Sequence, residues 1–257
     1  MDKPTKFITI CSGKGGVGKS FVAANLAHLL SQKGKTLLWD SNLNFPNLHL
    51  ILGVDPPLRL NDYISSNVKF KDTIFKVEQD FDLIIDSPLS DRLDSEHSEK
   101  FYEIYQEIKS LDTYDYVVID TMPGAGELVL ESCILSDLSI VLITDEPTTI
   151  VDSYGLLKLI LPFVESDKIG ILVNNVIDEE DYDEIISKIN LTTNKFLGVN
   201  FNNVGFIPYD REVRKSIQTQ ELITISNNNL PVSKNLHDIC GRIEQYLKSK
   251  NLINENR

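Results

Sequence analysis

The segment from residue 12 to residue 20 concentrates residue types that hold phosphate groups. It reads SGKGGVGKS and contains the pattern GxxxxGK[ST] from Gly13 to Ser20. Glycines at this spacing let the backbone wrap around phosphate oxygens with its N–H groups pointing inward. Lys19 is then expected to reach the β- and γ-phosphates, and the Ser20 hydroxyl is expected to bind Mg²⁺. The sequence therefore predicts a site for a nucleoside triphosphate and its magnesium ion.

The elements on either side of this segment are the ones that a phosphate-binding loop requires. The apolar run FITIC at 7–11 predicts a strand, and residues 21–32 predict a helix. The positive end of the helix dipole near Lys19 adds attraction for an anion. A chance match to the pattern is the alternative, and this strand–loop–helix context disfavours it. The residues predicted to contact the nucleotide here are Gly13, Lys14, Gly15, Gly16, Val17, Gly18, Lys19, Ser20 and Phe21.

An aspartate ends another apolar run. YVVID occupies 116–120 and finishes with Asp120. Because ligands of parallel sheets bind at the carboxyl ends of strands, Asp120 is expected to hold the Mg²⁺ shell through water. The alternative is an aspartate that merely caps the end of its strand.

Alternation of strands and helices predicts an α/β fold with a doubly wound, mainly parallel sheet flanked by helices. One domain is expected over 1–249, with a frayed tail at 250–257. No signal peptide is apparent, and no apolar run approaches the ~20 residues of a membrane span. The strands are expected at 7–11, 36–39, 82–86, 116–120, 139–144, 170–175 and 204–208. The helices are expected at 21–32, 95–111, 127–135, 148–164, 179–189, 210–219 and 233–249.

Charge and cysteine content exclude several classes of site. The net charge of −13 over 257 residues disfavours direct DNA binding, which needs a cationic surface. A small basic cluster at 211–215 is interpreted as an exposed helix face, with a functional basic patch as the alternative. The cysteines Cys11, Cys133 and Cys240 are far apart and form no CxxC pair. A disulfide framework or zinc site is therefore not expected, which fits a reducing cytosol.

The stretch from Lys14 to Ser20 resembles the deviant Walker A motif of the MinD/ParA family of P-loop ATPases. The resemblance implies a P-loop NTPase fold of the SIMIBI type, binding of ATP or ADP with Mg²⁺, and an ATP-dependent homodimer. In that family the early lysine, here Lys14, reaches across the dimer to the partner's nucleotide. An added cation there would stabilise the charge that develops during phosphoryl transfer. A solvated loop lysine is the alternative.

The resemblance continues along most of the chain. Residues 36–54 resemble the second strand and first switch of the family, and 116–126 resemble its Walker B strand and second switch. VNN at 173–175 and GFIPYD at 205–210 resemble its adenine pocket. The resemblance implies that Asn174 binds the edge of the base and that the backbone at Pro208, Tyr209 and Asp210 lines the pocket.

Three stretches, at 145–158, 194–223 and 230–243, resemble the FlhG branch of the family, also called FleN or YlxH. The resemblance implies a role in flagellar number and placement, and a protein partner such as a flagellar regulator or an SRP-type GTPase. FlhG proteins often carry an N-terminal extension that stimulates the GTPase FlhF, and no counterpart precedes the first strand. That stimulation is therefore not expected here.

The first switch departs from the family pattern. The family has two aspartates two residues apart, of which the second positions the attacking water. Here Asp40 holds the first place and Asn42 the second. Asparagine keeps the shape but cannot act as an anionic acceptor. The predicted catalytic residues are therefore Lys14, Asp40, Asn42 and Asp120, and slow hydrolysis is expected. The alternative is that the alignment of this segment with the family is out of register.

Other functions remain as alternatives. They are a ParA-like DNA-partitioning ATPase, an iron–sulfur carrier, and a scaffold that binds nucleotide without hydrolysis. An iron–sulfur carrier would need paired cysteines, and Cys133 has no expected partner. The C-terminal helix places Leu236, Ile239, Ile243 and Leu247 at helical spacing. This stripe is expected to pack on its own domain, with weak membrane contact as the alternative. The protein is expected in the cytoplasm, with a place at the inner face of the cell membrane as the alternative.

Overall fold

The computed structural model describes residues 4–43, 45–86 and 96–255. Over these residues the chain forms one sheet of eight strands in the order β3-β4-β2-β5-β1-β6-β7-β8. All neighbouring strands are parallel except β3, which is antiparallel to β4. The predicted doubly wound, mainly parallel sheet is confirmed. The strands are β1 (Lys6–Cys11), β2 (Thr36–Asp40), β3 (Phe75–Glu78), β4 (Phe81–Ile85), β5 (Tyr116–Asp120), β6 (Leu138–Ile143), β7 (Ile169–Val176) and β8 (Asn202–Pro208).

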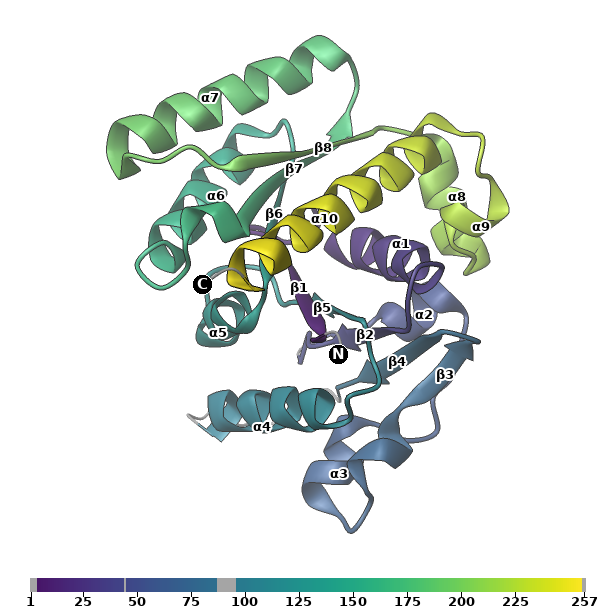
Figure 1. Ribbon diagram of the computed structural model, residues 1–257. Helices are drawn as coiled ribbons and strands as arrows, with labels where there is room; N and C mark the ends of the chain where they lie inside the picture. The colour runs from purple at the N-terminus through teal and green to yellow at the C-terminus, as the bar shows by residue number, and fades with distance from the viewer. Residues whose placement is uncertain (1–3, 44, 87–95, 256–257) are drawn as a thin grey trace.

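Helices cover both faces of the sheet, because its central strands are apolar on both sides (Figure 1). One core lies between the sheet and α1, α2, α9 and α10, and two further clusters lie under α3 to α7 on the opposite face. The α-helices are α1 (Lys19–Ser31), α2 (Leu48–Leu52), α3 (Leu60–Ser65), α4 (Glu96–Ser110), α5 (Glu127–Leu135), α6 (Pro147–Ile160), α7 (Glu179–Leu197), α8 (Arg211–Thr219), α9 (Ile223–Ser226) and α10 (Pro231–Glu255). Short 3₁₀ helices occupy Phe70–Thr73 and Ser166–Lys168.

Some elements differ from the sequence predictions. Strand β3 was not predicted, since four alternating residues at a sheet edge give a weak signal. Helix α7 was predicted to end at residue 189 but continues to Leu197, where Gly198 closes it at φ +70°. The last helix was predicted to end at residue 249, but α10 continues through Glu255, and the fraying of the tail stays a prediction. No glycine or proline follows Gly241, so nothing in the sequence stops that helix.

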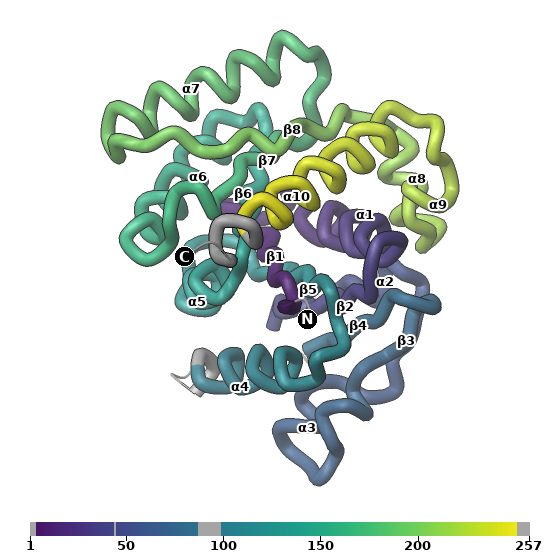
Figure 2. The backbone as a smooth tube through the Cα atoms, viewed as in Figure 1, coloured from purple at the N-terminus to yellow at the C-terminus, as the bar shows by residue number. Residues whose placement is uncertain are grey.

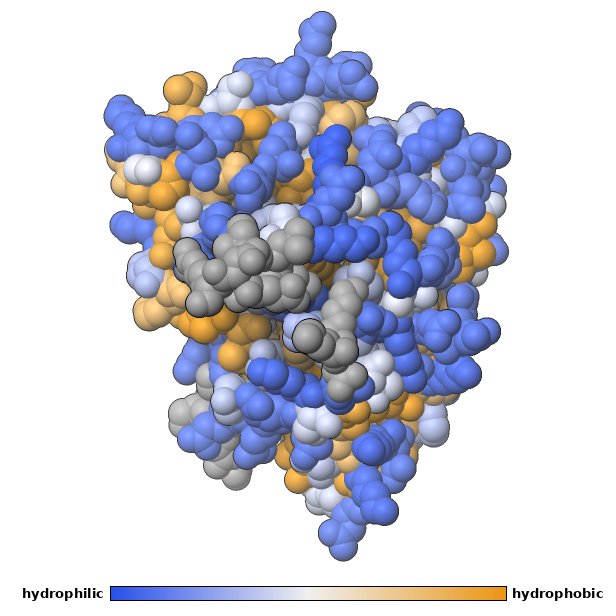
Figure 3. All heavy atoms as spheres, viewed as in Figure 1, coloured by the Kyte–Doolittle hydropathy of each residue, from blue (hydrophilic) through white to orange (hydrophobic). Residues whose placement is uncertain are grey.

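The apolar stripe of α10 belongs to the core. Leu236, Ile239, Ile243 and Leu247 are each at most 3% exposed. Figure 2 shows α10 beside α1, although they are far apart in the sequence, and the two helices are in contact. The face in Figure 3 is mainly hydrophilic around them. Packing on its own domain is therefore the outcome for this stripe, and none of the helices in the described ranges could cross a membrane.

Candidate functional site

The loop between β1 and α1 has the conformation that its glycines predict. Gly16 and Gly18 have φ of +78° and +97°, a region that residues with a Cβ rarely adopt. Gly18 precedes α1 without any side-chain cap. The first N–H groups of α1 have no intrahelical partner, so an anion in the loop would accept from them.

Lys19 lies inside this loop rather than on the surface. It is 7% exposed, and its Nζ donates to the Ser12 Oγ at 3.0 Å. Ser12 in turn donates to the Lys14 carbonyl at 2.7 Å. Burial lowers the pKa of Lys19, while the nearby Asp120 charge opposes that shift. Because the Ser12 hydroxyl is neutral, it leaves the positive charge of the buried ammonium free to bind an anion. Ser12 is a site residue that the motif alone did not identify.

Asp120 ends β5 next to Lys19 and is fully buried. Neither of its carboxylate oxygens has a hydrogen bond of normal geometry from the described residues. Burial, followed by the charge of Asp40, raises its pKa to about 7, whereas Ser20 and Lys19 favour the ionised form. An orphaned carboxylate beside a serine hydroxyl is a donor set that suits Mg²⁺, which prefers oxygen ligands and keeps several waters. The residues present therefore fit the predicted ion, with Ser20 and Asp120 as the groups that would hold it.

Asp40 ends β2 and organises the loop that follows. Its carboxylate accepts from the backbone N–H groups of Asn42, Asn47 and Leu48 at 3.2, 2.8 and 2.9 Å. Burial raises its pKa to about 6, and these three hydrogen bonds oppose the shift. Asp40 thus holds the start of the loop in place, which is a positioning role.

The side chain of Asn42 is engaged by its own loop. Its Nδ2 donates to the Phe45 carbonyl at 3.1 Å, and its Oδ1 accepts from the Phe45 N–H at 3.5 Å. Phe45 is 79% exposed, so this small turn lies at the surface. Asn42 must leave these contacts before it can orient a water molecule, and its predicted catalytic role stays a prediction.

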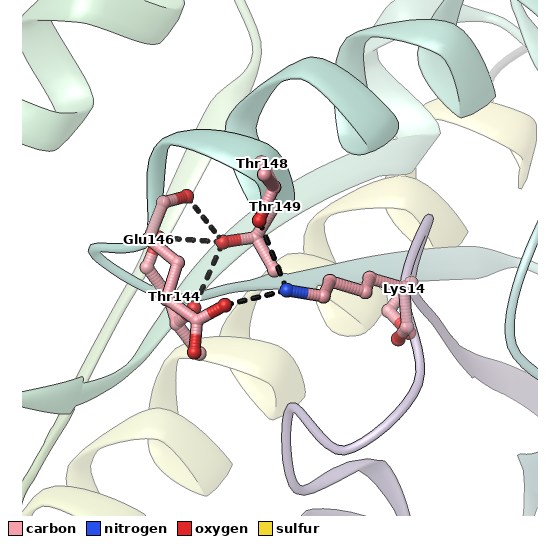
Figure 4. A network of polar contacts seen from close by, with 6 residues as sticks. Lys14, Thr144, Glu146, Thr148 and Thr149 are labelled. Carbon is pink, nitrogen blue, oxygen red and sulfur yellow. Dashed lines mark hydrogen bonds and ion pairs between the residues drawn. The ribbon is translucent and has the colours of Figure 1, made fainter.

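Lys14 is held within its own chain by the start of α6 (Figure 4). Its Nζ donates to Glu146 Oε2 at 2.6 Å and to Thr148 Oγ1 at 2.9 Å. Thr149 fixes the same turn by donating to the carbonyl oxygens of Glu146 and Thr144. Glu146 and Thr148 were missed as site residues. The only local signal was Pro147 at the first position of a helix, which says nothing about Lys14.

Asn174, at the end of β7, packs directly against the loop. It is buried, and its Nδ2 donates to the Val17 carbonyl at 2.8 Å. A Cβ on Gly18 would lie 2.5 Å from that amide nitrogen, so the close contact requires glycine. The tertiary structure therefore brings Asn174 to the phosphate loop, and its contact with a base stays a prediction.

The other residues of the predicted base pocket follow β8, the neighbour of β7. Pro208 pairs with Val176, and the Tyr209 N–H donates to the Val176 carbonyl at 2.8 Å. Asp210 caps α8 by accepting from the Glu212 N–H at 2.9 Å. Its carboxylate is thus used locally, and the backbone from Pro208 to Asp210 lies at the carboxyl edge of the sheet with Asn174.

The structure also places the cysteines and the basic cluster. Cys133 has a neighbouring thiol within its own chain, because its Sγ lies 3.8 Å from that of Cys11, a contact that the sequence did not predict; the absence of paired cysteines at a dimer interface stays a prediction. Sequence separation hid the contact, which depends on α5 packing against β1. Among the described residues no group of three or more His, Cys, Asp or Glu side chains could hold a metal ion. The basic cluster lies on α8, where Lys215 pairs with Glu212.

Gly13 predicts a sharp local effect of mutation. A Cβ there would lie 2.3 Å from the Asp152 carbonyl carbon and 2.7 Å from the Ser153 nitrogen, both backbone atoms of α6. We expect Gly13→Ala to lower the free energy of unfolding by about 1–3 kcal/mol, because a helix must move to make room. Gly15→Ala is the matched control, since its Cβ would meet only Pro123 at 3.7 Å. Urea unfolding, followed by the fluorescence of Trp39, measures both. Equal stabilities would contradict the expectation.

The comparisons with known proteins agree with this geometry. The family model described as the CobQ/CobB/MinD/ParA nucleotide binding domain matches residues 8–223. The antiactivator FleN of Pseudomonas aeruginosa is 28% identical over 222 residues, which cover 86% of this chain and 79% of that protein. The flagellum site-determining protein YlxH of Helicobacter pylori is 26% identical over 249 residues, covering 95% and 84%.

Solved structures show the same fold. The MinD cell division protein of Aquifex aeolicus superposes with a TM-score of 0.74 at 23% identity, covering 93% of this chain and 97% of that one. The septum site-determining protein MinD of Pyrococcus horikoshii, complexed with Mg-ADP, gives a TM-score of 0.74 at 22% identity, covering 93% and 96%. From its phosphate loop, its sheet and the family match over most of its length, the chain belongs to the CobQ/CobB/MinD/ParA family of nucleotide-binding domains.

Proposed function

We propose that this protein is a switch ATPase that binds ATP and Mg²⁺ and dimerises when ATP is bound. The observation that carries the proposal is that two buried side chains of opposite charge lie at one loop. Within the described part of the chain, the Lys19 ammonium is held by a serine hydroxyl, and the Asp120 carboxylate has no hydrogen bond of normal geometry. A phosphate group and a cation would satisfy these two side chains together, and burying them otherwise is costly.

Each residue then has a defined task. The N–H groups of the loop and of the first turn of α1 bind phosphate oxygens, and Lys19 neutralises their charge. Ser20 and Asp120 hold the magnesium ion, which would neutralise charge on the phosphates when bound. Asp40 keeps the first switch in register through its three backbone hydrogen bonds. Asn174 supports the loop from β7, and we propose that the rest of its side-chain amide binds the base.

The output of such a switch is a binding event with another protein. The relatives FleN and YlxH support a role in spatial positioning, and we propose flagellar number or placement, with a flagellar regulator or an SRP-type GTPase as partner. A nucleotide-binding scaffold without hydrolysis is the second candidate. It is favoured by Asn42, which lacks a carboxylate and is engaged with Phe45.

The proposal is tested by light scattering after size exclusion, with ATP or ADP and Mg²⁺, alongside phosphate release. A dimer with ATP and a monomer with ADP supports the switch. Failure to bind either nucleotide would overturn it. A stable ATP dimer without any phosphate release would support the scaffold instead.

Lys14 gives a prediction specific to the dimer. Lys14→Gln should bind ATP within about threefold of the wild-type affinity yet stay monomeric, because only the contact across the dimer is lost. The wild-type lysine must first leave Glu146, and a half-exposed ion pair of this kind costs only about 0–1 kcal/mol to break. Lys158→Gln, an exposed lysine of α6, is the control. If Lys14→Gln still dimerises at the ATP concentration at which the wild-type protein does, Lys14 does not act across the interface.

A further inference from the structure

Two buried thiols meet directly beneath the phosphate loop. The Sγ atoms of Cys11 and Cys133 are 3.8 Å apart, and both side chains are 0% exposed. Cys11 is the last residue of β1, so it immediately precedes Ser12. Cys133 lies within α5, the helix that follows the Asp120 segment. The contact therefore joins the two chain segments that supply Lys19 and Asp120.

The same two segments already touch through their backbones. The Gly124 N–H donates to the Ser12 carbonyl at 2.9 Å, and Thr121 donates to the Ile10 carbonyl through its N–H and its hydroxyl. Ser12 also holds the Lys19 ammonium. A change in the distance between β1 and α5 would therefore reach the residues that bind phosphate.

We propose that Cys11 and Cys133 form a reversible disulfide that weakens nucleotide binding. The inference rests on the nucleotide site of the proposed function. The sulfur atoms must approach from 3.8 Å to about 2.05 Å, the length of the bond, and we propose that the approach combines rotation of the side chains with a shift of the segments that carry them. Ser12, next to Cys11, would be displaced from Lys19 and from the Asp120 segment.

The chemistry balances with hydrogen peroxide as oxidant. The Cys133 thiolate attacks one peroxide oxygen, the O–O bond breaks, and hydroxide leaves, giving a sulfenic acid. The Cys11 sulfur then attacks the Cys133 sulfur, the S–S bond forms, and the second hydroxide leaves. The two thiol protons convert both hydroxides to water. Two thiols are oxidised and one peroxide is reduced to two waters.

The surroundings of the two thiols shift their pKa values in opposite directions. The contact with the Cys11 side chain lowers the pKa of Cys133, and the nearby Ser139 hydroxyl adds to this, although burial opposes it. The pKa of Cys11 is raised, chiefly by its contact with Cys133 and by burial. The same disulfide forms whichever of the two thiols is oxidised first, so the bond does not depend on this difference. Because both are buried, oxidation requires a local opening of the fold, and a reducing compartment would reverse the bond.

The test compares reduced and peroxide-treated protein. Disulfide mapping by mass spectrometry identifies a peptide that links Cys11 to Cys133, and a fluorescent ADP analogue with Mg²⁺ measures affinity. We expect the affinity to fall at least about tenfold on oxidation and to return with a reductant. Cys133→Ala should lose this response, whereas Cys240→Ala, which removes the third thiol, should keep it. By linkage, bound nucleotide should shift the thiol–disulfide equilibrium toward the two free thiols.

Three results would overturn the inference. Alkylation in denaturant after peroxide treatment could show both thiols still free. The linked peptide could form without any change in affinity. The loss of affinity could persist in Cys133→Ala, which would place the damage elsewhere. Failure of the reduced protein to bind the analogue would instead overturn the proposed function and, with it, the inhibitory part of this proposal, while peptide mapping would still report on the bond.

Discussion

Replacing Asn42 with aspartate should raise the rate of ATP hydrolysis by about 10²–10⁴-fold, the usual contribution of a general base. Asn42 stands in the first switch two residues after Asp40, which anchors the loop by accepting three backbone hydrogen bonds. The asparagine amide can orient a water molecule but cannot accept its proton as an anion. The substitution adds the missing negative charge without changing the size of the side chain.

The expected gain depends on where the new carboxylate points. The Asn42 amide now donates to the Phe45 carbonyl, and a carboxylate has no proton to donate there. Asn42→Asp therefore loses this contact, although a carboxylate oxygen can still accept from the Phe45 N–H. Single-turnover phosphate release measures the rate of the chemical step. Asn61→Asp on α3 makes the same chemical change at an exposed position and should leave the rate unchanged. If Asn42→Asp dimerises with ATP but hydrolyses no faster, the water is positioned by another residue.

Asp120→Asn should abolish Mg²⁺-dependent nucleotide binding and, in the absence of nucleotide, stabilise the fold. Loss of the carboxylate removes the only anionic group predicted to hold the ion. The same carboxylate is fully buried and has no hydrogen bond of normal geometry from the described residues, so its ionised form is costly in the free protein. We expect the free energy of unfolding at pH 8 to rise by about 2 kcal/mol. Asp72→Asn, at an exposed carboxylate, is the control for both measurements.

The pH dependence of stability provides an independent check on Asp120. Its pKa is raised to about 7 in the fold, first by burial and then by the Asp40 charge, from an ordinary value of 3.8. A raised pKa means that the folded state favours the protonated acid. Its contribution to stability is fully present below about pH 4 and is lost as the pH rises through about 7. Urea unfolding of the nucleotide-free protein should show this loss, and Asp120→Asn should reduce it. Equal pH profiles for the two proteins would contradict the assignment.

The sequence by itself determined the phosphate loop and the class of fold. The pattern from Gly13 to Ser20 is local, and each of its residues acts through its own backbone or side chain. The apolar runs predicted seven of the eight strands, because a strand buried on both faces is continuously apolar. Their alternation with helices then required parallel pairing. The sequence also predicted that Asp120 ends a parallel strand, and ligands bind at the carboxyl ends of such strands.

The tertiary structure alone decided which distant side chains meet at that loop. Glu146 reaches Lys14 only because α6 starts beside the loop, and no periodicity encodes a contact across 132 residues. Cys11 and Cys133 are 122 residues apart in the chain and meet only through the packing of α5 on β1. The catalytic role of Asp40 stays a prediction, and its three backbone partners lie in an irregular loop whose path the sequence does not specify. Local patterns fix local geometry, whereas contacts between segments depend on how the helices pack on the sheet.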